Sequence, residues 1–213
     1  HHRDEKSGLW SYADRSQEEY APGYYSVPLE RYGVVAEMTA TSRVGLHRYT
    51  FPAAEDAAIV FDLQNGGCWD RVTDSKMQVV GDNRIEGYRY SSGWANDQKV
   101  FFVAEFSKPM QELAITENGL YGRAKFATKA NEQVYVKVAI SPVSIEGAKA
   151  NMAAELPDWN FERTIKAATD ELTQAFYAVS EKLYQQANPQ DADGAQPGPD
   201  AGAQGGQYYD ADY

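Results

Sequence analysis

The stretch GVVAEMTAT, residues 33–41, shows the pattern that most of this chain follows. Val34, Ala36 and Met38 fall on one face of an extended strand, because successive side chains point to opposite sides. Glu37 alternates to the other face, as expected where one side of a strand meets a core and the other meets water. The stretch therefore predicts a half-buried β-strand.

Similar stretches recur on its C-terminal side, and three of them are apolar at nearly every position, as is typical of central strands. They stand about 10 to 15 residues apart, with Gly, Pro, Asn and Asp but no long helix between them, which favours an antiparallel sandwich. The fold is therefore predicted to be mainly β, with a partial antiparallel β-sandwich over residues 9–143. The predicted central strands are AAIVFDL (57–63), KVFFVAEF (99–106) and QVYVKVAIS (133–141), and RVGLHRYTF, RIEGYRY and RAKFAT are further candidates.

A helical segment is predicted over residues 144–187. Its first part is rich in Ala and predicts a short helix that Pro157 ends. Asp158 is expected to cap a second, long helix that continues to about Ala187. The apolar residues of that helix recur every three or four positions and so form one stripe. They are Phe161, Ile165, Ala168, Leu172, Phe176, Val179 and Leu183.

Residues 188–213 are predicted to be a disordered tail. They contain no Leu, Ile, Val, Met or Phe, carry five Asp and no base, and are dense in Gly, Pro, Ala and Gln. Such a composition offers too little apolar surface to offset the entropy of an ordered chain.

Charge and composition argue against several classes of function. A net charge of −11 would repel a phosphate backbone, so no nucleic acid is expected as a partner. No apolar run is long enough to span a bilayer, and the first residues contain no export signal. The single cysteine, Cys68, excludes an internal disulfide and gives no metal-ligand spacing. We predict no metal or cofactor within this chain.

The best candidates for ligand binding are aromatic. GGCWDRVTD places Trp69 beside Asp70, and SSGWANDQ places Trp94 near Asn96. Sugar rings stack on such aromatic faces while neighbouring polar groups bind their hydroxyls. The alternative is that each Trp, being flanked by Gly, is a packing anchor or an interdomain contact. His47, which has no second ligand or nucleophile near it in the sequence, is expected to be structural.

Three long stretches resemble the N-terminal domain of glycoside hydrolase family 92, a family of exo-acting α-mannosidases. They are PGYYSVPLERYGVVAEMTATSRVGLHRYTFP (22–52), GYRYSSGWANDQKVFFVAEFSKP (87–109) and VYVKVAISPVSIEGAKANMAAELPDWNFE (134–162). The resemblance covers about residues 9–162.

This resemblance implies a noncatalytic β-sandwich that is completed by strands upstream and followed by an (α/α)6 barrel. In the family the barrel carries a calcium site and the carboxylates of an inverting mechanism, so no residue here is assigned a catalytic role. The 213-residue chain alone is expected to be inactive. The implied partners are the barrel and mannose-containing glycans, and the implied location is periplasmic or secreted. Open sheet edges are expected to favour self-association.

The C-terminal part resembles a different family. IKAATDELTQAFYAVSEKLYQQANPQ, followed by PGPDAGAQGGQYYDADY, is similar to the last lid helix and tail of a DnaK-type chaperone, over about residues 165–213. The two resemblances meet near residues 160–166, which suggests a composite chain. Two alternatives to a mannosidase domain therefore remain. The chain is either a fragment of a cytoplasmic chaperone that binds peptides, or a composite without independent function.

Overall fold

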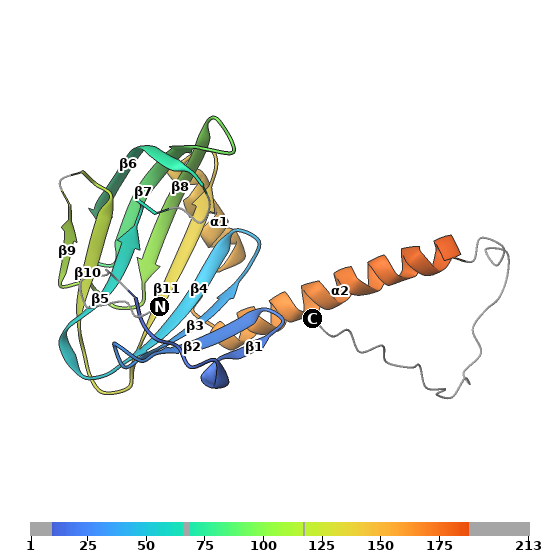
Figure 1. The fold of residues 1–213 in the computed structure, drawn as a ribbon, viewed down its shortest axis with the longest axis horizontal. Coiled ribbons are helices and arrows are strands. Elements are labelled where there is room, and N and C mark those ends of the chain that lie inside the picture. Colours follow the sequence, from blue (N-terminus) through green and yellow to red (C-terminus); the bar gives the residue numbers. More distant parts are fainter. Residues whose placement is uncertain (1–9, 66–68, 117, 188–213) are drawn as a thin grey trace. The chain divides into compact units, whose positions relative to one another are not determined.

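The computed structural model describes residues 10–65, 69–116 and 118–187 (Figure 1). A first compact unit extends to Leu172, and a second begins at Thr173. The expectations for Cys68 and for the tail at 188–213 lie outside the described residues.

The elements follow one another as a long series of strands and then two helices. The strands are β1 (Glu19–Ala21), β2 (Tyr24–Leu29), β3 (Val34–Ala40), β4 (Val44–Phe51), β5 (Ala54–Asp62), β6 (Arg71–Val80), β7 (Arg84–Ser92), β8 (Gln98–Phe106), β9 (Glu112–Ile115), β10 (Tyr121–Thr128) and β11 (Glu132–Ser141). A 3-10 turn, η1 (Arg15–Gln17), precedes them, and α1 (Ile145–Glu155) and α2 (Phe161–Ala187) follow.

The strands form two antiparallel sheets that face each other. The larger has eight strands in the order β1-β2-β3-β4-β11-β8-β7-β6, and the smaller has three in the order β5-β10-β9. This arrangement confirms the predicted fold class: a mainly β, antiparallel, partial sandwich followed by a short and a long helix. The three-stranded sheet covers only part of the eight-stranded one.

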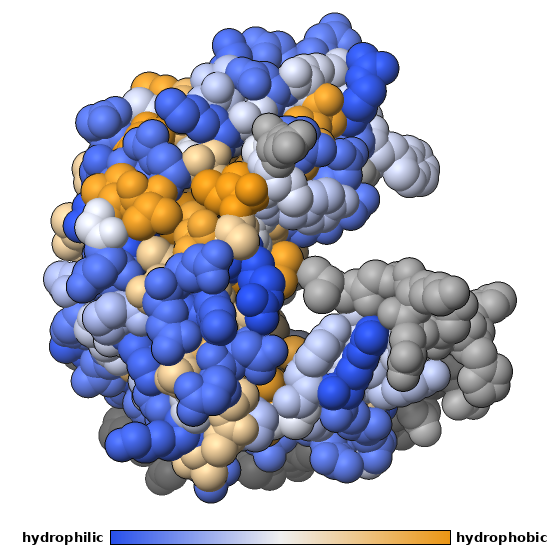
Figure 2. Space-filling model, turned by 90° about the vertical axis from the view of Figure 1, so that its left-hand side faces the viewer, coloured by the Kyte–Doolittle hydropathy of each residue, from blue (hydrophilic) through white to orange (hydrophobic). Residues whose placement is uncertain are grey.

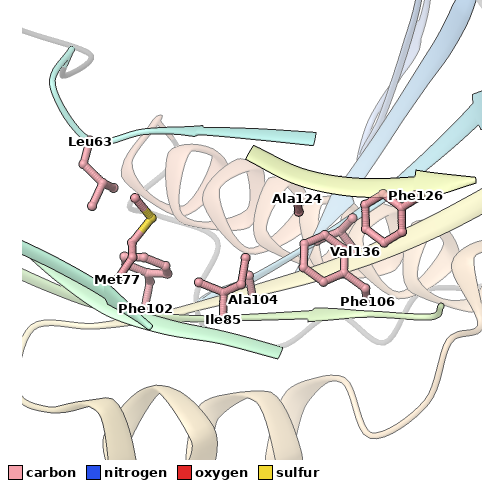
Figure 3. Packing of buried hydrophobic residues seen from close by; sticks show 9 residues of the cluster. All are labelled: Leu63, Met77, Ile85, Phe102, Ala104, Phe106, Ala124, Phe126 and Val136. Carbon is pink, nitrogen blue, oxygen red and sulfur yellow. The ribbon is translucent and has the colours of Figure 1, made fainter. Parts of the chain in front are cut away.

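The core between the sheets is built from residues that alternate along the strands. Phe102, Ala104 and Phe106 on β8 meet Ala124 and Phe126 on β10, and all five are buried. Figure 3 shows these side chains together with Leu63, Met77, Ile85 and Val136, which complete the cluster.

The opposite face of the larger sheet is covered by α1 and the beginning of α2. Val103 on β8 and Ala139 on β11 point to this side, where they pack with Met152 of α1 and Phe161 of α2. The central strands are therefore buried on both faces, which explains why their sequences are apolar at nearly every position. The prediction that β8 and β11 are central strands is confirmed. For residues 57–63 it is wrong, because β5 lies at the edge of the smaller sheet and pairs only with β10.

The helix ends are capped by local side chains. Ser144 caps α1, because its hydroxyl accepts a hydrogen bond from the Gly147 amide at 2.9 Å. The cap of α2 is Asn160 and not Asp158 as predicted, since Asn160 Oδ1 accepts from the Arg163 amide at 2.9 Å. Asp158 instead accepts from the Asn160 amide at 3.0 Å, so that it shapes the turn that leads into the cap.

The first turns of α2 are fastened to the larger sheet by one arginine. Arg48 on β4 donates to both carboxylate oxygens of Glu37 on β3, at 2.6 and 2.7 Å, and to Glu162 of α2 at 2.7 Å. Its guanidinium lies 4.3 Å from the centroid of the Phe161 ring. Further along, the Thr169 hydroxyl donates to the Pro22 carbonyl at 2.7 Å. This part of α2 therefore also contacts the sandwich directly.

The second unit contains the rest of α2, from Thr173 to Ala187. Phe176, Val179 and Leu183 form the predicted apolar stripe, and their side chains are exposed. Within the described residues, neither helix combines the length and the apolar character needed to span a bilayer.

Candidate functional site

The two predicted tryptophans are brought together at the open end of one hairpin. Strands β6 and β7 pair antiparallel, with Arg71 opposite Ser92 at this end. Trp69 stands two residues before Arg71 and Trp94 two residues after Ser92. A Cβ atom built on Gly93 would lie 2.4 Å from the Trp69 carbonyl oxygen, so the backbone just before Trp94 lies against that of Trp69.

Both tryptophans are almost fully open to solvent. The exposed fraction is 99% for Trp69 and 98% for Trp94. A large aromatic side chain usually buries most of its surface, so neither residue is a packing anchor within this chain. Two exposed indole rings at one end of a hairpin are suited to contact a sugar ring or another protein surface.

The two polar candidates differ in their surroundings. Asn96 is exposed in the turn after Trp94. Asp70 is held by Arg89 on β7, which donates to its two carboxylate oxygens at 2.5 and 3.1 Å. These hydrogen bonds lower the pKa of the Asp70 carboxyl to about 2. Both oxygens of Asp70 are thus engaged with Arg89, and Asn96 is the freer of the two to meet a ligand.

A pair of tyrosines on the same hairpin was missed by the sequence analysis. Tyr88 and Tyr90 stack with ring centroids 4.5 Å apart, and the Lys99 ammonium lies 5.6 Å from the Tyr90 centroid. The signal was present in the sequence, because Tyr at two alternate positions of a strand lies on one face. Only the pairing of β7 with β8 adds Phe101 to this cluster.

A cavity of about 290 Å³ opens between the two sheets. Its walls are mostly apolar, with Phe61 on β5, Phe102 on β8 and Val138 on β11. The polar groups in it are Asp62 of β5 and a pair on β4, where His47 Nδ1 lies 2.8 Å from the Tyr49 hydroxyl. Burial lowers the pKa of His47 and raises that of Tyr49 to about 12, so both are neutral near pH 7. Hydrophobic residues also gather at the surface on the face shown in Figure 2.

A second hollow, of about 360 Å³, lies beside the end of α1. In its lining, Glu155 accepts from the Thr41 hydroxyl at 2.6 Å and from Arg43 Nε at 2.6 Å. These hydrogen bonds join α1 to the turn between β3 and β4. The lining of neither hollow includes Trp69 or Trp94.

The described residues do not fit a calcium site. Calcium takes six to eight oxygen ligands, several of them carboxylates, and the described part of the chain contains no group of three or more His, Cys, Asp or Glu side chains placed to hold a metal ion.

The fold is shared with solved α-mannosidases. A family GH92 α-mannosidase from Bacteroides thetaiotaomicron is 32% identical over 75% of this chain, with a TM-score of 0.71, and the match spans 24% of that enzyme. An inverting mannosidase of the same family, from Bacteroides thetaiotaomicron VPI-5482, is 24% identical over 74% of this chain, with a TM-score of 0.62 and 22% of its own length covered. The chain thus spans about a quarter of the length of these enzymes.

A family model agrees with the structural comparison. The model of the glycosyl hydrolase family 92 N-terminal domain matches residues 1–141, which include every strand from β1 to β11. We conclude that this chain belongs to the family of glycosyl hydrolase family 92 N-terminal domains.

Proposed function

We propose that this domain is the noncatalytic N-terminal part of an exo-acting α-mannosidase, and that its tryptophan-bearing hairpin end helps to frame the glycan pocket. The observation that carries the proposal is the almost full exposure of Trp69 and Trp94 at the same end of one hairpin, on a domain of this family. The related enzyme from Bacteroides thetaiotaomicron has been solved in complex with mannoimidazole, which supports a mannose-type ligand.

In this proposal the domain works by contact and not by chemistry. The indole rings offer apolar faces to the C–H groups of a mannose ring, and Asn96 offers an amide to its hydroxyls. The partner surface is the (α/α)6 barrel that follows this domain in family members, and the location is periplasmic or secreted.

The test is a glycan-binding titration of the purified protein. Trp69→Ala and Trp94→Ala should each weaken the binding of α-1,2-linked mannobiose by about tenfold or more, because truncating a central aromatic contact removes its stacking surface. Tyr20→Ala is the matched control, since Tyr20 is also a largely exposed aromatic but lies on β1. Unchanged affinity in both tryptophan variants would refute the proposal.

For residues 165–213 the resemblance to a chaperone lid and tail remains a proposal. The exposed stripe of Phe176, Val179 and Leu183 favours a segment made to pack in a helical bundle. Independent sequencing reads across the codons for residues 160–166 are the direct test. Reads that fail to span this junction would mean that the two parts do not belong to one natural protein.

A further inference from the structure

We propose that Arg89 is the positioning residue of the tryptophan pair, because from the strand that leads to Trp94 it binds Asp70, the residue that follows Trp69. This inference rests on the proposed function for the glycan that the pair would meet. The placement of the two rings can be tested without any glycan.

The segment that contains Trp69 joins β5 to β6. At its first end, Arg89 Nε donates to the Leu63 carbonyl at 2.7 Å. At its last end, the other two nitrogens of the guanidinium donate to the carboxylate of Asp70. One side chain on β7 thus binds both Leu63 and Asp70, and Trp69 directly precedes Asp70.

The ion pair of Arg89 and Asp70 is largely buried, whereas the neighbouring Trp69 side chain is exposed to solvent. The exposed fraction is 4% for the Asp70 side chain and 16% for that of Arg89. A paired arginine fork in such a setting fixes both the distance and the orientation of its carboxylate. The Trp69 side chain, at 99% exposure, has almost no packing of its own, so its backbone is held mainly through the neighbouring Asp70.

The backbone next to Trp94 is held by a close contact with the backbone of Trp69 and Asp70. A Cβ atom on Gly93 would lie 2.4 Å from the Trp69 carbonyl oxygen and 2.8 Å from the Asp70 Cα. Only glycine allows the turn before Trp94 to approach Trp69 so closely. The Gly93 amide also donates to the Ala95 carbonyl at 2.9 Å, which closes the turn around Trp94. Arg89 and Gly93 therefore fix the two tryptophans relative to one another by independent means.

The experiment compares three variants of the full chain. Arg89→Gln removes both the charge and the fork, whereas Arg89→Lys keeps the charge but cannot bind Asp70 and Leu63 together. Gly93→Ala places a methyl group against the backbone of Trp69 and Asp70, and so disturbs the close contact next to Trp94. Each protein is labelled with 5-fluorotryptophan, which gives one fluorine signal for each of the four tryptophans, and Trp→Phe variants assign the signals.

The fluorine signals of Trp69 and Trp94 should shift or broaden in all three variants, and those of Trp10 and Trp159 should stay in place. A general loss of structure would move all four, so this pattern separates positioning from unfolding. Affinity for α-1,2-linked mannobiose should fall about tenfold in Arg89→Gln, since a binding site must hold its contacts to within about 0.5 Å. Arg89→Lys should not restore it.

Failure of this inference can be told apart from failure of the proposed function. If the unaltered protein binds the glycan and Arg89→Gln binds it equally well, or if Arg89→Lys restores full affinity, Arg89 does not act by positioning. If the unaltered protein does not bind the glycan, the proposed function fails, and the fluorine signals decide alone. Unmoved signals of Trp69 and Trp94 in Arg89→Gln would then overturn the inference.

Discussion

Phe161 is the residue whose truncation best measures how firmly α2 is joined to the sandwich. Its side chain is 1% exposed, although it is the first residue of a helix. Its ring meets Tyr24 edge-on at 6.3 Å and Tyr135 at 6.4 Å between centroids, and the Arg48 guanidinium lies over it at 4.3 Å. Strands β2, β4 and β11 therefore all contribute to the site that holds this ring.

The expected cost of Phe161→Ala is about 4 kcal/mol of unfolding free energy. Removing a fully buried Phe usually costs about 3 to 5 kcal/mol, and loss of the arginine contact with the ring favours the upper part of that range. The loss of unfolding free energy is limited, because the beginning of α2 can detach from the sheet once its packing energy is lost. In that case the amides of Thr164 and Thr169 would exchange faster than those of the central strands.

Urea unfolding followed by circular dichroism measures this loss, and hydrogen exchange shows whether the helix detaches first. Phe176→Ala is the matched control in the same helix, because the Phe176 side chain is exposed, and it should change stability by no more than about 0.5 kcal/mol. A loss below about 1 kcal/mol for Phe161→Ala, with unchanged exchange at Thr164, would show that this ring is not part of the core.

Three further results are expected. Glu37→Gln should lower the free energy of unfolding by about 2 to 3 kcal/mol at pH 7, because it breaks a largely buried ion pair with Arg48. Arg48 lowers the pKa of Glu37, so this difference from the unaltered protein should shrink as the pH falls below the ordinary value of 4.5. Lys137 is 3% exposed, its ammonium lies 4.2 Å from the Trp159 ring centroid, and burial lowers its pKa. The unfolded chain therefore binds more protons than the folded one, and the free energy of unfolding should rise as the pH approaches 10.5. In urea titrations at several pH values, Lys137→Met should lack this rise. Leu183→Asp should leave the unfolding free energy of the first unit within about 0.5 kcal/mol of its original value, and a loss above about 2 kcal/mol in a monomer would contradict the reading of Leu183 as exposed.

The sequence predicts strands well where the residues alternate or are continuously apolar. It located β3, β4, β5, β7, β8, β10 and β11 closely, because period-two alternation and turn residues are local signals. It missed β6 (Arg71–Val80), whose residues are mostly polar and which lies at the edge of its sheet. It also missed the short strands β1 and β9, and β2, which contains Pro28. That residue is tolerated because β1 pairs with β2 only as far as Ser26.

For the candidate site, too, the sequence predicts some features and only the tertiary structure determines the others. Composition and flanking glycines sufficed to select Trp69 and Trp94, since exposed-looking aromatics in polar turns are visible in a single sequence. Nothing local says that they lie at the same end of one hairpin. That follows from the β6–β7 register, and their support follows from contacts of Arg89 with Leu63 and Asp70, which are 26 and 19 residues away.

The same distinction holds for the helices. Their positions could be predicted from Ala content, the apolar stripe and Pro157, all of which act within a few turns. The sequence could not show that Arg48 would meet a helix 114 residues further along the chain, or that Phe161 would fill a site made by three strands. Local periodicity determines which elements form, because it depends on neighbouring residues alone. The order of strands and the docking of α2 depend on which distant surfaces bury each other best, and only the folded chain brings those surfaces together.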